Sequence, residues 1–294
     1  YIPATDGNSL VLTIDSDIQN YLEKHLETAL ADNPEARDGV SGIVMNVKTG
    51  EVLAMANLPD FDPNDAYKLT SEKYINELKK NVAKILKEEN VKAEIPDAWY
   101  TEGGLDNLPE AIHDNSDLVD ALGSARVNIL MKTWRNPVIA DNYEPGSTFK
   151  ALVLAAALEE GVVNMNTTFT CTGSIHVEGW GKAINCSKRA GHGTQTLKVA
   201  TGNSCNPAFV TMGLKIGTEA YYRYLKSFGL METTGIDLPA EAEGIFANED
   251  SFNSNVVSLA AYSFGQTFNV TPLELIRAQA ACINGGYLYT PYVV

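Results

Sequence analysis

The sequence predicts an α/β fold in which a sheet packs against helices and a mostly helical lobe is attached to it. Two apolar, β-like runs at 41–47 and 51–56 are joined by a short turn that ends in Gly50, as in a hairpin. From Asp60 to about Arg135 the composition changes to polar and helix-forming residues, which is typical of an inserted helical segment. Strand signals and helix signals therefore occupy different parts of the chain.

The N-terminal segment is expected to supply a strand and a helix. Residues 10–14 form a short apolar run that predicts a strand. Residues 15–30 carry apolar side chains at the spacing of one helix face, at Ile18, Leu22, Leu26 and Leu30. Further helices are expected within 71–90, over 147–160, over 197–216 and at the end of 256–287, whereas 167–196 has the composition of a loop.

We interpret residues 1–294 as a single domain. Its α/β part is expected to comprise 1–60 and about 210–294, and its mostly helical lobe about 61–209. Because the chain begins with Tyr1 and ends on an apolar stretch at Val294, both ends are expected to be cut from a longer protein.

The charge of the chain excludes one class of function. With 37 acidic and 22 basic residues the formal net charge is −15, whereas nucleic-acid binding needs clustered Lys and Arg. No apolar run approaches the roughly 18 residues that a membrane-spanning helix needs. We therefore expect no nucleic-acid partner, and no membrane span within the chain.

The pattern Ser-x-x-Lys at 147–150 is the strongest candidate for chemistry. It opens an Ala- and Leu-rich helix, and its spacing puts the hydroxyl of Ser147 and the amine of Lys150 on one helix face. A serine hydroxyl needs a base, and burial at a helix N-terminus lowers the pKa of a lysine so that part of its population is neutral. The pattern alone is weak, since a chain of this length contains about one by chance. Its position at the start of a buried helix favours a nucleophile with an adjacent base.

The residues around this pattern resemble the transpeptidase domain of the class B penicillin-binding proteins, the peptidoglycan D,D-transpeptidases. In that family the Ser and Lys of Ser-x-x-Lys are nucleophile and base. The similar stretches are 143–150, 12–15 with 18–19, 49–56, 62–64, and 264–266 with 270–273, and the segment from about 65 to 130 matches least. The resemblance implies a penicillin-binding protein or serine β-lactamase-like fold, with a sheet flanked by helices and a mostly helical lobe that carries Ser147.

The second motif of this family, Ser-x-Asn, occurs twice in the chain. The copy at 204–206 has a distance from Ser147 and flanking residues similar to the family's, whereas the copy at 251–253 lies in a polar stretch. The resemblance therefore assigns catalytic roles to Ser204 and Asn206. Ser204 would relay protons to the leaving amine, and the amide of Asn206 would hold the substrate.

The third motif, Lys-Ser/Thr-Gly, binds the substrate carboxylate in this family and supplies one N–H group to the oxyanion hole. No copy follows residue 206. The copy at 48–50 precedes the nucleophile and falls in the predicted hairpin, so we interpret it as a structural turn. The domain is therefore expected to be truncated at its C-terminus, before the functional copy.

Three of the four cysteines lie close together in the sequence. Cys171, Cys186 and Cys205, with His192, offer three thiolates and an imidazole, which are ligands of tetrahedral structural zinc. The alternatives are a Cys171–Cys186 disulfide or unpaired thiols, and His176 is a rival fourth ligand. Some penicillin-binding proteins have a similar metal site beside Ser-x-Asn, so the resemblance adds to the expectation of zinc.

The resemblance implies a serine-type acyltransferase that cross-links peptidoglycan stem peptides at D-Ala-D-Ala and is acylated by β-lactam antibiotics. It also implies a role in bacterial cell-wall synthesis and cell shape, with a glycosyltransferase partner. The expected location is the extracytoplasmic face of the cell membrane, with an N-terminal anchor outside this chain. Two alternatives share Ser-x-x-Lys. One is a serine β-lactamase, for which we identify no deacylating Glu, and the other is a non-enzymatic β-lactam sensor domain.

Overall fold

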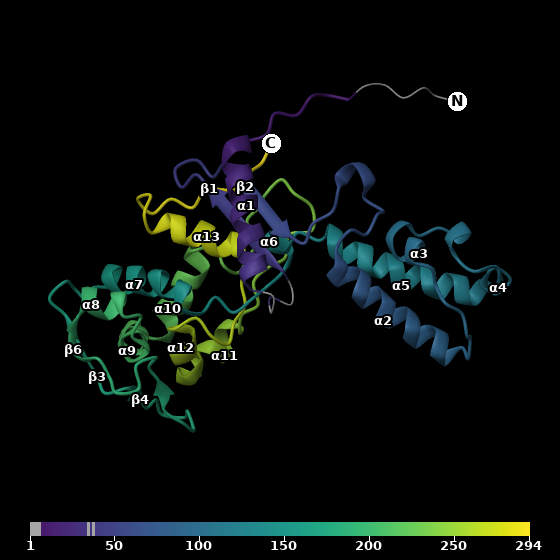
Figure 1. The fold of residues 1–294 in the computed structure, drawn as a ribbon. Coiled ribbons are helices and arrows are strands. Elements are labelled where there is room, and N and C mark those ends of the chain that lie inside the picture. The colour runs from purple at the N-terminus through teal and green to yellow at the C-terminus, as the bar shows by residue number, and fades with distance from the viewer. Residues whose placement is uncertain (1–6, 34–35, 37–38) are drawn as a thin grey trace. The chain divides into compact units, whose positions relative to one another are not determined.

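The protein structure, a computed structural model, describes residues 7–33, 36 and 39–294. The chain divides into two units by its internal packing. The first unit runs up to residue 23 and includes 42–56 and 137–294, and the second comprises 24–41 and 57–136. Ser147 lies in the first unit, together with most of the sheet residues (Figure 1).

The predicted hairpin is confirmed. Strands β1 (Val40–Met45) and β2 (Val52–Leu58) form a two-stranded sheet, and a parallel bridge between Glu51 and Tyr292 places the last residues beside β2. Gly50 closes the turn with φ +84°, and a Cβ there would lie 2.6 Å from the carbonyl oxygen of Thr290. Both the left-handed backbone and this close approach require glycine, so the Lys-Thr-Gly sequence at 48–50 serves a turn.

The expected strand at 10–14 is wrong, although the helix that follows is confirmed. The backbone N–H of Thr13 donates to Val293 O (2.8 Å) and its hydroxyl donates to Val52 O (2.6 Å), but no strand ladder forms among the described residues. Leu10, Val11 and Leu12 are exposed, so this apolar run has no sheet face to cover. Helix α1 spans Ser16–Asp32. It begins after Asp15, whose Oδ1 accepts hydrogen bonds from the backbone N–H groups of Asp17 and Ile18.

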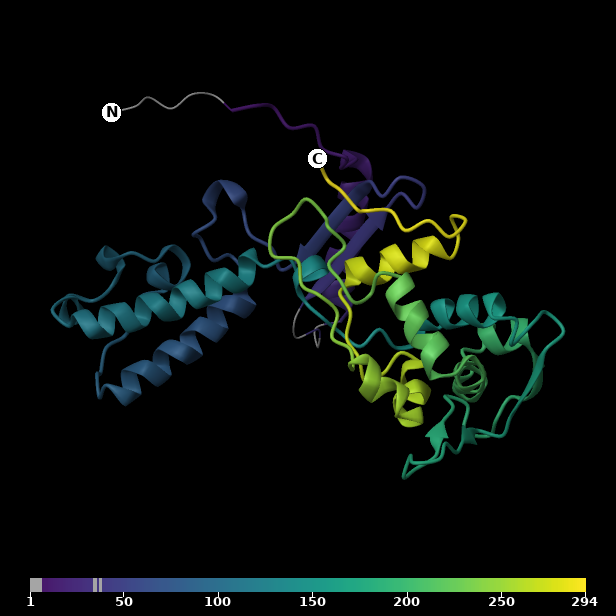
Figure 2. The same cartoon turned by 180° about the vertical axis from the view of Figure 1, so that it is seen from behind.

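The second unit is helical, as the composition of 60–135 predicts. Its helices are α2 (Glu72–Glu88), α3 (Asp97–Glu102), α4 (Glu110–His113) and α5 (Ser116–Trp134), with short 3₁₀ turns at Pro63–Asp65 and Leu105–Asn107. Helices α2 and α5 pack side by side (Figures 1 and 2). Leu78 and Val82, one turn apart on α2, are fully buried in the same core as Leu122. This confirms the amphipathic helix expected within 71–90.

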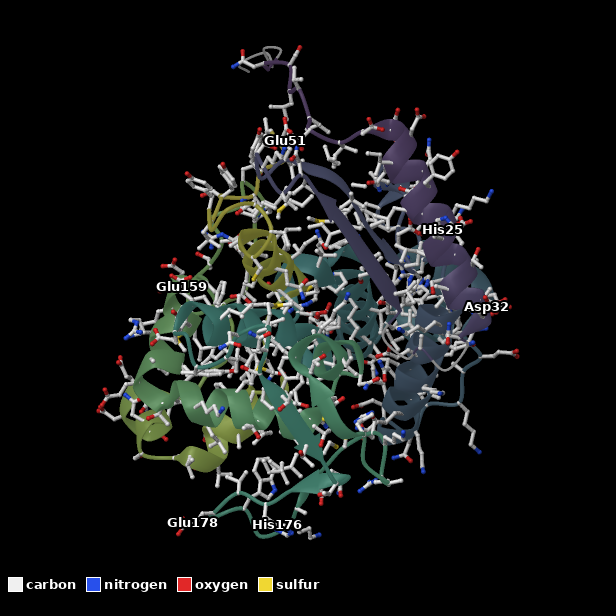
Figure 3. The ribbon with its side chains drawn as sticks, turned by 90° about the vertical axis from the view of Figure 1, so that its left-hand side faces the viewer. His25, Asp32, Glu51, Glu159, His176 and Glu178 are labelled. Atoms are coloured by element: carbon white, nitrogen blue, oxygen red, sulfur yellow. The ribbon has the colours of Figure 1, made fainter. Side chains whose placement is uncertain are left out.

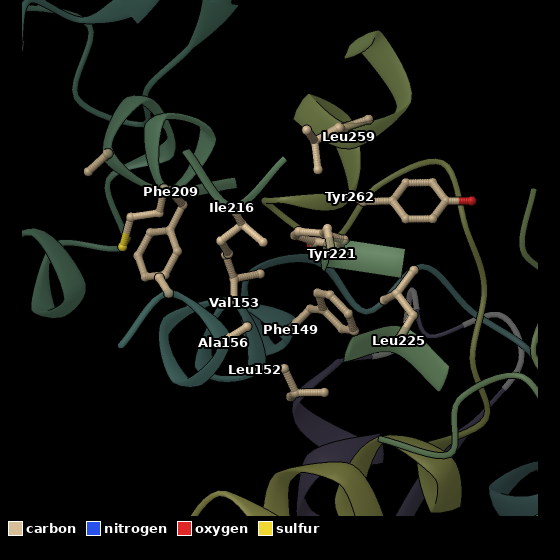
Figure 4. Packing of buried hydrophobic residues seen from close by; sticks show 14 of the residues in the cluster. Phe149, Leu152, Val153, Ala156, Phe209, Ile216, Tyr221, Leu225, Leu259 and Tyr262 are labelled. Atoms are coloured by element: carbon tan, nitrogen blue, oxygen red, sulfur yellow. The ribbon is translucent and has the colours of Figure 1, made fainter. Parts of the chain in front are cut away.

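The first unit packs its helices around α7 (Lys150–Glu159). The others are α6 (Pro137–Ala140), α8 (Leu197–Gly202), α9 (Asn206–Ile216), α10 (Thr218–Ser227), α11 (Glu249–Asn253), α12 (Val256–Tyr262) and α13 (Pro272–Ala281), and a 3₁₀ turn (η3, Gly146–Phe149) precedes α7. Leu152, Val153 and Ala156 of α7 face the core that Phe209 and Tyr262 share with them (Figure 4). The helix expected over 147–160 is thus present, buried and preceded by a tighter turn.

Two expectations for 167–216 need correction. The segment expected to be a loop contains β3 (Thr168–Cys171), β4 (Ser174–Ile175), β5 (Ile184–Asn185) and β6 (Gly193–Thr196), in two antiparallel pairs, β3–β6 and β4–β5. These strands are too short to show an alternating pattern in a Gly-rich sequence. The single helix expected over 197–216 is broken at 203–205, between α8 and α9.

No helix within the described ranges of the chain is both long and apolar enough to cross a lipid bilayer.

Candidate active site

Ser147 and Lys150 face each other across one 3₁₀ turn. In such a turn, side chains three residues apart lie nearly above one another. The Nζ atom of Lys150 lies 3.1 Å from Ser147 Oγ. The turn is held on its N-terminal side by the Thr148 hydroxyl, which donates to Pro145 O at 2.6 Å, and on its C-terminal side by the buried ring of Phe149.

The amine of Lys150 is buried and surrounded by oxygen atoms. The residue is 4% exposed. Besides Ser147 Oγ, its Nζ lies 2.8 Å from Ser204 O, 2.9 Å from Ser204 Oγ and 2.6 Å from Asn206 Oδ1. Two of these four atoms, a carbonyl and an amide oxygen, can only accept hydrogen bonds, whereas the two hydroxyls can also donate. A neutral amine has two N–H groups for the obligatory acceptors and one lone pair for a hydroxyl proton. The arrangement therefore suits an amine that receives a proton from Ser147.

The electrostatic environment favours the same state of Lys150. Burial removes water from the ammonium form and lowers the pKa of Lys150 to about 8, although the nearby Cys186 and Cys205 act to raise it. At pH 7, a pKa of about 8 leaves about one amine in ten neutral. A base is thus present at neutral pH without any other titratable group.

The break between α8 and α9 brings the second motif to Lys150. Ser204 adopts a left-handed backbone, with φ +48°, that few residues other than glycine adopt. Its N–H donates to Thr201 O at 2.9 Å, while its carbonyl and hydroxyl oxygens both face Lys150. A continuous helix over 197–216 would turn the Ser204 carbonyl along the helix axis, so the break has a role in the site.

Asn206 begins α9 and is held from both sides. Its Oδ1 accepts from Lys150, and its Nδ2 donates to the carbonyl oxygen of Asn185 in β5 at 2.9 Å. An amide nitrogen carries two hydrogens, so one N–H group of Asn206 remains for a substrate carbonyl. The alternative Ser-x-Asn at 251–253 lies in α11, where Phe252 is fully buried, and contributes none of the four oxygen atoms around Lys150.

A close backbone contact that the sequence did not predict holds the turn that carries Ser147. Gly146 N–H donates to Gly265 O at 2.8 Å, and a Cβ on Gly265 would lie 1.9 Å from Gly146 O. Tyr143 and Val270 form a two-bond bridge beside this contact, each bond 3.0 Å long. The similarity of 264–266 to the family was the only sequence signal, because a contact between residues so far apart leaves no local pattern.

The three clustered cysteines and His192 come together from four elements. Cys171 ends β3, Cys186 follows β5, His192 precedes β6 and Cys205 caps α9. Their ligand atoms all lie within 4.8 Å of one another, and all four cysteines of the chain have free thiols. His176 is exposed on the loop of the β4–β5 hairpin and is not part of this cluster (Figure 3).

The donor set of this cluster fits a tetrahedral zinc ion. Zn–S bonds of about 2.3 Å separate neighbouring ligands by roughly 3.8 Å, a spacing that the 4.8 Å limit of the cluster allows. Burial acts to raise the pKa of Cys171, but hydrogen bonds from the backbone N–H groups of Gly173 and His192 lower it to about 6. Burial raises the pKa of Cys205 to about 12. The Cys171 thiol therefore ionises readily, whereas the neighbouring Cys205 thiol keeps its proton unless a cation binds.

Two grooves meet at Ser147. One runs along α7 and is lined by a mixture of alkyl side chains, such as Leu154 and Leu158, and polar groups that include Lys150 and Ser204. The other lies toward the β4–β5 hairpin and is lined by Trp180, Phe264, Asn185, Asn206 and Gln266. A carbonyl group placed at Ser147 Oγ would therefore extend in two directions into different surroundings.

Comparison with known proteins agrees with this geometry. The family model of the penicillin binding protein transpeptidase domain matches residues 40–294. Stage V sporulation protein D of Bacillus subtilis is 35% identical over 297 residues, which cover 100% of this chain and 35% of that protein. Peptidoglycan D,D-transpeptidase FtsI of Escherichia coli is 27% identical over 293 residues, which cover 99% of this chain and 38% of that protein. This chain thus spans little more than a third of these relatives.

A solved structure shows the same fold. The crystal structure of penicillin binding protein 3 from Mycobacterium tuberculosis, complexed with ampicillin, matches with a TM-score of 0.68 at 24% sequence identity. The match covers 100% of this chain and 51% of that one. The expected α/β fold of the penicillin-binding protein and serine β-lactamase type is thereby confirmed.

The contact between Gly146 and Gly265 generates a prediction. Gly265→Ala should lower the free energy of unfolding by about 2 kcal/mol or more, because the new methyl group overlaps Gly146 O and the backbone φ of +80° disfavours alanine. Urea denaturation measures the change. Gly123→Ala is the control, since its Cβ meets no atom within 4 Å and alanine favours helix α5. Equal stability of the Gly265 variant and the unchanged protein would contradict the contact.

Proposed function

Because this chain belongs to the family of penicillin binding protein transpeptidase domains, we propose that it cross-links peptidoglycan stem peptides through an acyl-enzyme on Ser147. The observation that carries the proposal is the 3.1 Å contact between Ser147 Oγ and the buried Lys150 amine. Lys150 has the lowered pKa that a base requires, and Ser204 and Asn206 complete the set of polar groups around it.

The proposed acylation uses Lys150 as the base. Ser147 Oγ attacks the carbonyl carbon of the penultimate D-Ala, and its proton passes to the Lys150 lone pair. The C–N bond to the terminal D-Ala then breaks, and the departing nitrogen takes a proton from Lys150 through the Ser204 hydroxyl, 2.9 Å from Nζ. The free N–H group of Asn206 orients the donor peptide. The products are a Ser147 ester and free D-Ala, with Lys150 neutral again.

The second half of the reaction reverses these steps with a new amine. An amine of a neighbouring stem peptide attacks the ester carbonyl and gives up a proton to Lys150. The ester C–O bond breaks, and Lys150 returns the proton to Ser147 Oγ, so that a new amide bond links the two stems. A β-lactam enters the same first half-reaction, but its ring opening leaves the departing nitrogen attached, and Ser147 stays acylated.

The substrate determines where the proposed reaction takes place. Stem peptides lie outside the cytoplasmic membrane, so we place this domain on its extracytoplasmic face, held there by an anchor outside this chain. Cross-linking also requires glycan strands that carry the stems, and a glycosyltransferase that makes these strands is the proposed partner. Support for this setting comes from the similarity to FtsI of Escherichia coli, which is named a peptidoglycan D,D-transpeptidase.

We also propose that Cys171, Cys186, His192 and Cys205 hold one structural zinc ion. Support comes from the ligand atoms gathered within 4.8 Å and from the match of three thiols and an imidazole to tetrahedral zinc. Four protein ligands leave no position for water, so the ion would supply rigidity rather than catalysis. Because Cys205 lies between Ser204 and Asn206, that rigidity would act on the second motif.

The nucleophile is tested by covalent labelling of the full-length protein. A labelled penicillin should attach to Ser147, and Ser147→Ala should abolish the label because, among the described residues, only the Ser147 hydroxyl both contacts Lys150 and lines both grooves, whereas Ser204 lines one. Peptide mapping by mass spectrometry identifies the site. Ser251→Ala, in the alternative Ser-x-Asn, should label normally. Label on the Ser147→Ala protein would contradict the proposal, and fast release of the label would favour a β-lactamase.

The base is tested by the pH dependence of acylation. Since burial lowers the pKa of Lys150 to about 8, the acylation rate should rise about tenfold per pH unit below that value and level off above it. Lys150→Arg keeps the charge but cannot lose its proton, so the rate should fall by at least about 100-fold and should not recover at pH 9. Stopped-flow measurements supply the rates. A rate that is independent of pH between 6 and 8 would remove Lys150 from this role.

The metal is tested by elemental analysis of protein purified without chelator. About one zinc per chain is expected, with Cys171→Ser or His192→Ala lowering both the zinc content and the melting temperature, because each removes one ligand. Cys282→Ser is the matched control, since this thiol lies outside the cluster, at the residue that caps the C-terminus of α13. Protein that lacks zinc and carries a Cys171–Cys186 crosslink in mass spectra would show that the disulfide alternative is right.

A further inference from the structure

The turn that carries Ser147 is held from both sides by a distant stretch of the chain, 265–279. On the N-terminal side of Ser147, the backbone contact described above is joined by a side chain, because the N–H of Thr267 donates to Glu144 Oε1 at 2.8 Å. Thr267 has φ +71°, in the left-handed region that few residues other than glycine adopt. The chain that enters the turn is therefore fixed by residues 123 positions away in the sequence.

One side chain of α13 holds the turn on the C-terminal side of Ser147. The Nε2 atom of Gln279 donates to the carbonyl oxygen of Thr148 at 2.8 Å. Thr148 directly follows the nucleophile, and its own hydroxyl is bound to Pro145 O. The contact from Gln279 therefore acts on the peptide unit next to Ser147.

The geometry of this turn decides how Lys150 meets Ser147. The Lys150 N–H donates to Ser147 O, which is an i→i+3 bond, and α7 begins at Lys150. In a 3₁₀ turn, residues three apart lie on the same side of the axis, whereas in an α-helix three residues advance by about 300°. Conversion of the turn to an α-helix would rotate the two side chains about 60° apart and lengthen their 3.1 Å contact.

The Gln279 amide satisfies the carbonyl group that this change of helix type leaves over. Phe149 is the N-cap of α7, so its carbonyl accepts the first i→i+4 hydrogen bond of the helix. The Thr148 carbonyl comes before that point and accepts from Gln279. Without this donor, a replacement within the helix is the N–H of Leu152, four residues on, and a bond to it would extend the α-helical pattern back into the turn.

We propose that Gln279 is a positioning residue for acylation, which holds the 3₁₀ turn so that Ser147 Oγ stays opposite the Lys150 amine. This inference rests on the proposed acylation of Ser147. Gln279 acts through the Thr148 backbone and contacts none of the reacting atoms. Loss of its amide leaves the reacting groups present but lets the turn relax, so it lowers the rate of bond formation rather than the affinity for the donor.

The test measures saturation kinetics of acylation by benzylpenicillin in the full-length protein. Gln279→Met keeps an uncharged side chain of similar length but removes the donor. Its acylation rate constant should fall by about tenfold, while the Kd of the preceding non-covalent complex should stay within about twofold. Gln279→Lys again places an N–H donor at the end of a long side chain, so it should restore the rate constant to within about threefold.

Asn284→Ala is the matched control for stability. The Asn284 amide donates to Val47 O at 2.8 Å, so it also joins a side chain to a distant backbone carbonyl, but at the β1–β2 hairpin. This variant should lower the melting temperature without lowering the acylation rate constant.

Hydrogen exchange, followed by mass spectrometry, tests the turn without any penicillin. Gln279→Met should speed exchange in peptides that cover 146–152 by about tenfold, because the turn opens more often, and Asn284→Ala should not.

An unchanged acylation rate constant in Gln279→Met, or an equal loss in Asn284→Ala, would overturn the inference. Unchanged hydrogen exchange over 146–152 in Gln279→Met would overturn it as well. Failure of benzylpenicillin to acylate Ser147 in the unchanged protein would instead contradict the proposed function, and the hydrogen-exchange comparison would still decide whether Gln279 holds the turn.

Discussion

The buried amine of Lys150 is the constraint on which the active site depends. Lys150 as a residue is 4% exposed, so its amine loses hydration, and this loss is tolerable only if oxygen atoms replace the water. Those oxygens come from residues far away in the sequence, at 204 and 206, and from Ser147 one turn earlier. The same desolvation lowers the pKa of Lys150 toward neutrality. The hydrogen bonds of Lys150 and its lowered pKa thus both follow from the burial of its amine beside these oxygen atoms.

This placement explains the irregular backbone around Ser204. A straight helix over 197–216 would satisfy the backbone better, yet it could not aim a carbonyl, a hydroxyl and an amide at one amine. The left-handed Ser204, at a cost of about 1–3 kcal/mol, ends α8 and lets Asn206 start α9. The carbonyl of Asn185 then fixes the Asn206 amide from the other side. The backbone strain at Ser204 is offset by the hydrogen bonds that Ser204 and Asn206 then make with Lys150.

The segment 168–196 links this strained turn to the rest of the site. Its strands are short, and its residues bury few large side chains, so packing alone gives the loops between them little rigidity. The cluster of three thiols and His192 joins the ends of β3, β5 and β6 to the start of α9. The β4–β5 hairpin begins and ends between two of these cysteines, and it carries Trp180 to the groove. The cluster and the groove wall therefore belong to one structural element.

The sequence by itself determined the features that rest on local patterns. Helical periodicity predicted α1 and α2, and the turn at Gly50 predicted the hairpin. The pattern Ser-x-x-Lys at the start of a buried helix identified Ser147 and Lys150 as candidate catalytic residues. Resemblance to a family, rather than periodicity, selected Ser204 over Ser251, and ligand types selected the cysteine cluster. These choices needed local spacing, residue chemistry or resemblance to a family, and none of the three requires knowing how distant segments pack.

Only the tertiary structure decided the features that depend on long-range contacts. The apolar run at 10–14 forms no strand ladder, although Thr13 donates hydrogen bonds to Val293 O and Val52 O, and its own residues do not reveal which distant backbone groups it will meet. The choice of His192 over His176 as a member of the cluster depends on which loop returns to Cys171. The contact of Gly146 with Gly265, and the reach of Trp180 into the groove, join residues that share no sequence neighbourhood. The physical reason is the same in each case, because desolvation and close packing act between segments that meet only after folding.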